Sequence, residues 1–275
     1  MSQDDRSSAS RRSTIPPFGI GTWQNTDPAA CSNAVEQALE MGYRHVDTAQ
    51  AYDNEEHVGE GIAAADVDRE DIFLATKVWI DSLGYDDVLE STRESLEKLD
   101  VGYLDLLYVH WPAEAYDPED TLPAFQELYD DGVIERIGVS NFEPRHLDRA
   151  REVLDAPIAA NQVEMHPLLP QEELREYSNR HDIELVAYSP LARGAVFDVP
   201  EIQSVAEKHG VSEAQVSLAW LRDNDVTVIP KATSEEHIRD NWASRDLTLD
   251  ADDLKTIDGI DREERQVDPD FGPWN

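Results

Sequence analysis

Short runs of apolar residues alternate with longer segments of mixed polarity through most of the chain. The short runs are rich in β-branched and aromatic residues and predict strands at 43–48, 72–78, 103–110, 136–141, 159–165, 184–189 and 226–231. The segments between them predict helices, for example at 28–41, 85–99, 121–131, 171–181 and 213–223. In the second of these, apolar side chains recur at helical spacing with Glu and Arg between them.

The order of these elements predicts the fold class. Seven strand–helix units follow one another, and a weaker pattern at 245–249 is interpreted as an eighth strand before a last helix. Regular alternation of this kind indicates a parallel sheet with helices outside it. Eight units in 275 residues favour a closed (β/α)₈ TIM barrel, a fold of about 250 residues, over an open sheet. We expect one barrel domain at 15–275, preceded by a disordered polar tail at 1–14.

A dinucleotide-binding sheet of the Rossmann type is not indicated. Its fingerprint needs G-x-G-x-x-G after the first strand. The nearest match, at 19–24, lacks the third glycine and follows Pro16 and Pro17, so we interpret it as a short hairpin or turn.

The most unusual feature of the composition is its net charge. The chain has 59 Asp and Glu against 23 Lys and Arg, a net charge of −36 spread over its length. Such a field repels phosphate backbones and anionic lipid, so no nucleic-acid or membrane partner is expected. Self-repulsion is tolerable in concentrated salt, because the Debye length falls to roughly 3 Å at about 1 M. We therefore hypothesise a halophilic protein from a salt-rich cytoplasm.

Cysteine usage and hydropathy agree with a cytoplasmic location. Cys31 is the single cysteine of the sequence, which excludes an internal disulfide and fits a reducing compartment. No apolar stretch approaches the roughly 18 residues of a membrane span. Arg11 and Arg12 could begin a twin-arginine signal, but the polar and proline-rich residues that follow them argue against export.

Polar or aromatic residues recur at the carboxyl ends of the predicted strands. They are Asp47, Lys77, His110, Ser140, Asn141, Gln162, Glu164, Tyr188 and Lys231. In a barrel these ends meet at one rim, where active sites are built. Turns and helix N-caps also enrich Asp, Asn and Ser at such places, which is the alternative explanation for any single one of them.

Four of the residue types suggest proton-transfer chemistry. A buried Lys77 needs a carboxylate partner, and Asp47 on the neighbouring strand can supply one. The lysine would lower the pKa of Tyr52 and make its phenol a usable acid, while His110 would bind a substrate oxygen or act as a base. The alternative interpretation is that Lys77 forms a Schiff base with the substrate. No metal site is expected, because no H-x-H or H-E-x-x-H motif occurs.

At these residues the sequence closely resembles the aldo-keto reductase family, in its prokaryotic type. The motifs that carry the resemblance are G-Y-R-H-V-D-T (42–48), L-A-T-K-V-W (74–79), L-Y-V-H-W-P (107–112), G-V-S-N-F (138–142), N-Q-V-E-M-H-P (161–167), A-Y-S-P-L (187–191) and I-P-K-A-T (229–233). They follow the family's order from about residue 15 to the end of the chain. The resemblance implies a (β/α)₈ barrel that reduces small aldehydes and ketones with NADPH or NADH and without metal.

The resemblance also implies roles for individual residues. Asp47, Tyr52, Lys77 and His110 would form the catalytic tetrad, with Tyr52 as the general acid. The implied cofactor contacts are Gly21, Thr22, Ser140, Asn141, Gln162, Tyr188, Ser189, Leu191, Lys231, Thr233 and Asn241, with Tyr188 stacked on the nicotinamide. Trp23, Trp79 and Trp111 would line the substrate pocket beside His110, although packing in the core is an alternative for each of them.

Four positions bear on which cofactor binds and how. Members that prefer NADPH usually have Ser and Arg where this chain has Ala232 and His237. A neutral imidazole cannot grip a 2′-phosphate as a guanidinium does, so NADPH is expected through Lys231 and NADH use becomes plausible. Asp240 stands where a Glu often meets the adenine amine.

The remaining expectations concern residues beside the site and the assembly. Glu164 and His166 are expected to serve the structure, and His45 to face the other side of its strand from Asp47. Substrate choice is assigned to loops that include 268–275, where Phe271 or Trp274 could close over the pocket. The alternatives to a reductase are a regulatory subunit with little turnover and the Schiff-base lyase. We expect a monomer, by analogy with small reductases of this kind.

Overall fold

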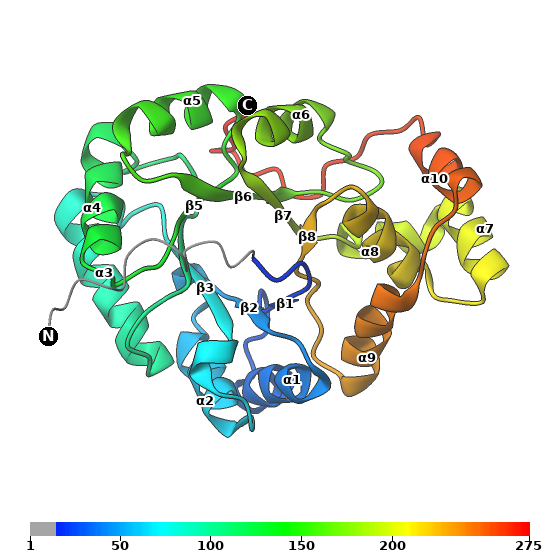
Figure 1. Cartoon of the computed structure of the whole chain (residues 1–275), viewed down its shortest axis with the longest axis horizontal. Coiled ribbons are helices and arrows are strands. Elements are labelled where there is room, and N and C mark those ends of the chain that lie inside the picture. Colours follow the sequence, from blue (N-terminus) through cyan, green and yellow to red (C-terminus); the bar gives the residue numbers. More distant parts are fainter. Residues whose placement is uncertain (1–14) are drawn as a thin grey trace, which may run out of the picture.

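The computed structural model describes residues 15–275, and eight parallel strands form the centre of the molecule (Figure 1). The predicted tail at 1–14 lies outside the described residues. In order along the sheet, the strands are β1 (Ile20–Gly21), β2 (His45–Asp47), β3 (Phe73–Val78), β4 (Leu106–Val109), β5 (Ile137–Ser140), β6 (Ile158–Glu164), β7 (Glu184–Tyr188) and β8 (Thr227–Val228). Parallel bridges from Phe18 to Val228 and from Gly21 to Lys231 join the first strand to the last. The predicted single-domain (β/α)₈ barrel is confirmed.

The helices lie outside the ring of strands, as Figure 1 shows. They are α1 (Pro28–Met41), α2 (Glu55–Ala64), α3 (Tyr85–Leu99), α4 (Pro118–Asp130), α5 (Pro144–Val153), α6 (Glu172–His181), α7 (Pro200–His209), α8 (Glu213–Asp223), α9 (Glu235–Ala243) and α10 (Ala251–Asp258). The predicted bounds 28–41, 85–99 and 213–223 agree with α1, α3 and α8. No helix within residues 15–275 is long and apolar enough to cross a membrane.

Capping residues account for the sharp ends of α1. The Asp27 side chain accepts a hydrogen bond from the Ala30 backbone N–H at 2.8 Å, and Pro28 opens the helix. Gly42 ends it in the left-handed region, at φ 111°. These local signals explain why the sequence predicted this helix to the residue.

Two predictions about the shortest elements are wrong. The stretch at 19–24 is not a hairpin, because Ile20–Gly21 is the first barrel strand and pairs in parallel with β2. The alternative prediction of a turn is right for Trp23 and Gln24, which follow this strand. The stretch at 245–249 is not the eighth strand, since it leads from a 3₁₀ turn (Ser244–Asp246) to α10, and the eighth strand is Thr227–Val228. A strand of two residues is too short to show alternation. Close packing also favours a glycine at position 21, because a Cβ there would lie 2.7 Å from the Ile229 carbonyl oxygen.

The inside of the barrel changes from apolar to polar along the strands. Alternate residues of β3 point inward: Phe73 and Ala75 join the apolar interior, and Lys77 reaches the functional rim. His45 belongs to this interior too, because its ring packs edge-on against Phe73 at 4.9 Å. The expectation that His45 faces away from Asp47 is therefore wrong, since residues two apart on a strand share a face.

Candidate active site

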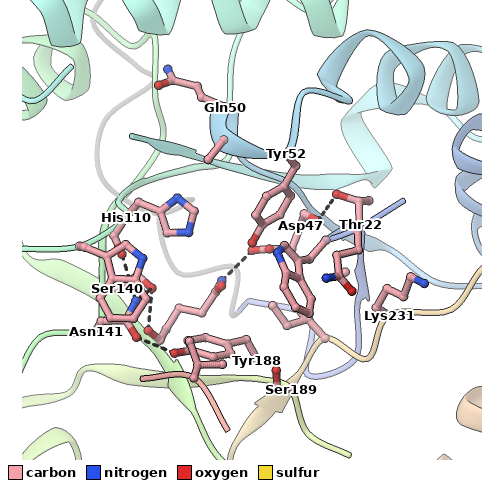
Figure 2. A pocket seen from close by; sticks show the side chains of 18 of the residues that line it. Thr22, Asp47, Gln50, Tyr52, His110, Ser140, Asn141, Tyr188, Ser189 and Lys231 are labelled. Atoms are coloured by element: carbon pink, nitrogen blue, oxygen red, sulfur yellow. Dashed lines mark hydrogen bonds between the residues drawn. The ribbon is translucent and has the colours of Figure 1, made fainter. Parts of the chain in front are cut away.

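The four residues expected to form the tetrad come from neighbouring elements at one rim of the barrel. Asp47 ends β2, Lys77 is the penultimate residue of β3 and His110 directly follows β4. Tyr52 ends a 3₁₀ turn (Gln50–Tyr52) that follows β2. In Figure 2 the Tyr52 hydroxyl, the His110 ring and the Tyr188 ring surround one space. The structure thus brings all four together.

The Lys77 ammonium lies at the centre of this group, with its side chain 1% exposed. Its Nζ forms an ion pair with Asp47 Oδ1 and donates to the Thr48 carbonyl oxygen at 2.8 Å and to the Tyr52 hydroxyl at 3.3 Å. The second oxygen of Asp47 accepts from Gln162 Nε2 at 2.7 Å. Both charges of the buried pair are therefore hydrogen-bonded, which offsets the cost of taking them out of water.

The pKa values of Lys77 and Tyr52 follow from this environment. Burial lowers the pKa of Lys77, but Asp47 and Tyr52 outweigh it, so that the pKa lies above its usual value. Burial raises the pKa of Tyr52, and the Lys77 ammonium opposes this without reversing it. The predicted sign of the lysine's effect is right. The expected net lowering is wrong, because desolvation of the phenolate is the larger effect.

His110 is held in its neutral form. Burial first, and the Lys77 ammonium second, keep the pKa of His110 well below its usual value. The imidazole meets the rings of Tyr52 and Trp79 edge-on, with centroids 5.9 and 5.0 Å away. A neutral imidazole can donate one hydrogen bond to a substrate oxygen without carrying a charge.

The other side of the cavity consists of hydroxyl and amide groups. Tyr188 donates to Asn141 Oδ1 at 2.8 Å, Asn141 Nδ2 donates to Ser140 Oγ at 3.1 Å, and Ser140 donates to the Gln162 carbonyl oxygen at 2.8 Å. Asn141 Nδ2 is also 3.1 Å from the His110 carbonyl oxygen, so this chain runs up to the tetrad. Donors and acceptors of this kind beside an aromatic ring fit the carboxamide and ring of a nicotinamide.

The cavity has a volume of about 1000 Å³, enough for a dinucleotide's reactive half together with a small substrate. Among the expected cofactor residues, the cavity is lined by Gly21, Thr22, Ser140, Asn141, Gln162, Tyr188, Ser189, Leu191 and Lys231. Thr233, His237, Asp240 and Asn241 lie outside the cavity lining. The Asp240 carboxylate accepts from Ser212 and Gln215, each at 2.6 Å, and so braces the start of α8.

Aromatic rings form the substrate side. Trp23, Trp79 and Trp111 all line the cavity, and so does Phe271 from the C-terminal segment. The Phe271 ring lies edge-on to Trp111 at 5.4 Å and to Trp79 at 6.4 Å. This arrangement favours the pocket role of the three tryptophans over simple core packing.

Arg193 and Gln50 are two of the cavity-lining residues that sequence reasoning did not assign. Arg193 lines the cavity and stacks over the Trp23 ring, with Cζ 4.5 Å from the centroid. Gln50 also lines it and accepts from the Trp79 backbone N–H at 3.0 Å. Gln50 could have been assigned to the site from the sequence, because it lies two residues before Tyr52. Arg193 lies in an irregular segment at positive φ, for which no local pattern exists.

Comparison with known proteins supplies the family. The model of the aldo/keto reductase family matches residues 17–262. The chain belongs to the aldo/keto reductase family. An aldo-keto reductase of Mycolicibacterium smegmatis is 43% identical over 263 residues, 95% of each chain. The glyoxal reductase of Bacillus subtilis is 40% identical over 252 residues, 91% of each chain. A crystal structure of an aldo-keto reductase from a deep-sea metagenome library has a TM-score of 0.88 at 36% identity, and the match covers 94% of this chain and 95% of that one.

Membership places the chain among enzymes that reduce carbonyl groups to alcohols. It is an oxidoreductase, with the barrel fold of its relatives.

Proposed function

We propose that this protein reduces small aldehydes and ketones, including dicarbonyl and sugar-derived compounds, to alcohols with NAD(P)H, and that Tyr52 is the proton donor. One observation carries the assignment: the Tyr52 hydroxyl lies 3.3 Å from Lys77 Nζ and faces the cavity that His110 also lines. The relative named glyoxal reductase supports a small dicarbonyl as one substrate class.

In this proposal, NAD(P)H supplies the hydride when it is bound. His110, being neutral, donates a hydrogen bond to the carbonyl oxygen and orients it. Tyr52 gives its proton to the same oxygen as negative charge develops there. Lys77 stabilises the phenolate left behind, and Asp47, itself held by a hydrogen bond from Gln162, keeps the ammonium in place. These groups are fixed before the reaction, and they act most strongly on the charge of the transition state.

The amide and hydroxyl chain of Ser140 and Asn141 would hold the nicotinamide, with Tyr188 against its ring. We propose that both nicotinamide cofactors are used, with NADPH expected through Lys231. His237 is exposed, and an exposed imidazole is a weak partner for a 2′-phosphate.

Replacing His237 with arginine tests this view of cofactor choice. A guanidinium adds a charge-assisted hydrogen bond, so His237→Arg is expected to lower KM for NADPH about three- to tenfold, a gain kept small by exposure. KM for NADH should stay within twofold. Steady-state kinetics with both cofactors measure the effect. A wild type that already prefers NADPH by a large factor would contradict the role given to His237.

The Schiff-base lyase is a weaker candidate. A nucleophilic lysine needs a lowered pKa, whereas the pKa of Lys77 is raised. A regulatory subunit would bind nucleotide with negligible turnover. A panel of carbonyl compounds, followed by NADH and NADPH absorbance, separates this alternative from the reductase. Borohydride trapping of a substrate on Lys77 without nucleotide would instead support the lyase.

We further propose that the protein works in a salt-rich cytoplasm, on the strength of its net charge of −36, and as a monomer, by analogy with small reductases of this kind. Screening of that charge is expected to raise Tm by on the order of 10 °C between low salt and about 1 M NaCl. Thermal melts across a salt series check this, with an uncharged osmolyte as the control. An unchanged Tm, with full activity after desalting, would remove the proposal.

A further inference from the structure

The last fourteen residues, 262–275, form a strap that ends at the active-site cavity. In Figure 1 the chain end lies beside α5 and α6. An Arg145 side-chain N–H from α5 donates to the Pro273 carbonyl oxygen at 2.5 Å. Val267, Pro269 and Phe271 of the strap line the cavity. The strap therefore carries part of the pocket wall, although it belongs to no helix or strand.

The buried side chain of Glu164, at the end of β6, attaches the strap to the barrel next to the cavity. Both of its carboxylate oxygens accept backbone N–H groups of the strap: Oε1 from Gln266 at 2.6 Å and Oε2 from Val267 at 2.8 Å. A further backbone hydrogen bond, from Glu264 N to the Leu168 carbonyl oxygen at 2.8 Å, holds the strap two residues before Gln266.

His166 completes the anchor. Its Nε2 lies 2.9 Å from Glu164 Oε1, and both side chains are 0% exposed. Because a carboxylate only accepts, Nε2 must carry the hydrogen in this contact. A buried charge with three donors on it is well satisfied, whereas a buried carboxylate without them would be costly. The attachment is thus specific to the charge and shape of a carboxylate.

The position of the strap decides where its aromatic end lies. Four residues after Val267, the Phe271 ring meets Trp111 and Trp79, and the Trp274 ring meets Trp111 at 5.6 Å. The two Phe271 contacts are edge-on and the Trp274 contact is tilted, so ring packing alone sets no hydrogen-bond register. The bonds from the Gln266 and Val267 backbone N–H groups to Glu164 do set one, next to the residues that line the cavity, while the Arg145 bond to Pro273 holds the far end of the strap.

We propose that Glu164 is a positioning residue that sets the aromatic wall of the substrate pocket by holding the strap at Gln266 and Val267. The inference rests on the proposed carbonyl reduction. Bulky carbonyl compounds that reach Phe271 depend on this anchor, and small ones that need only the tetrad do not.

Replacing Glu164 with glutamine, together with hydrogen exchange, is the first test. The amide keeps the shape but offers one acceptor oxygen in place of two. Amide exchange at 266–267 should become at least tenfold faster, while exchange in β3 and β4 is unchanged. KM for 4-nitrobenzaldehyde should rise about tenfold, because small displacements at a binding wall have large effects, whereas KM for glyoxal stays within threefold. Glu173→Gln, an exposed change on α6, is the matched control.

A second pair of variants leaves the barrel untouched and covers the case in which Glu164→Gln does not fold. Gln266→Pro removes the N–H that donates to Oε1, and Gln266→Ala trims a side chain outside the cavity lining but keeps that N–H. The proline variant alone should speed exchange at Val267 and raise KM for the bulky aldehyde. If Gln266→Pro matches Gln266→Ala in both measurements, the anchor has no positioning role. Equal changes in KM for both aldehydes would also overturn the proposal, and an inactive wild type would refute the proposed reaction instead.

Discussion

Replacing Tyr52 with phenylalanine is expected to lower kcat for carbonyl reduction by about 10²- to 10⁴-fold, the usual contribution of a positioned general acid. The ring would stay in place, because its packing against His110 does not involve the hydroxyl. Only the proton donor and the contact with Lys77 Nζ at 3.3 Å are lost. Steady-state kinetics with glyoxal measure kcat, and a fluorescence titration measures cofactor affinity separately.

Cofactor affinity should stay within about threefold of wild type in this variant, because the Tyr52 hydroxyl is not among the groups expected to bind nucleotide. Tyr85→Phe serves as the control, since it removes a phenol hydroxyl outside the cavity lining, where it donates to Glu127. Undiminished reduction by Tyr52→Phe would refute the assigned acid.

The directions in which the pKa values of Tyr52 and His110 are shifted also determine how the rate should depend on pH if Tyr52 is the acid. The raised pKa of Tyr52 keeps its proton in place up to at least its ordinary value near 10. The lowered pKa of His110 keeps the imidazole neutral as the pH falls through about 6.5, where a free histidine titrates. The rate of reduction by the wild type should therefore stay level between these limits.

How accurately the sequence predicts each helix or strand depends on how many residues carry its pattern. Helix α1 has a capping aspartate, a proline at its first position and a glycine at its end, and its bounds were predicted to the residue. The strands that carry Asp47 and Lys77 near their carboxyl ends were found because runs that contain aromatic and β-branched residues precede each polar one. Strands β1 and β8 have two residues each, so their place depends on barrel closure, which no local pattern carries.

The site shows the same contrast. Strand-end polarity located Asp47, Lys77 and His110, because parallel strands place their carboxyl ends at one rim. The direction in which the pKa of Tyr52 is shifted could not be predicted, since it is decided by how completely the barrel excludes water from the phenol. The bonds from Glu164 to the strap join residues about a hundred positions apart, and they exist only through tertiary packing.

Replacing Asp47 with asparagine is expected to have the largest effect on stability, because it leaves the Lys77 ammonium buried without its counter-charge. Loss of one partner of a buried ion pair typically costs about 3–5 kcal/mol. Both side chains are at most 2% exposed, so water cannot replace the carboxylate. Chemical denaturation at pH 7 should show this loss in the free energy of unfolding, together with a fall in kcat of at least about tenfold.

A double variant separates the charge from the packing. Asp47→Leu combined with Lys77→Met removes both charges, and apolar replacement of a whole buried pair is often close to neutral. Its free energy of unfolding should return to within about 2 kcal/mol of wild type, while activity stays lost because nothing then stabilises the Tyr52 phenolate. If Asp47→Asn were as stable as wild type, the ammonium would have another partner, and the ion pair would not be what holds Lys77 against Tyr52.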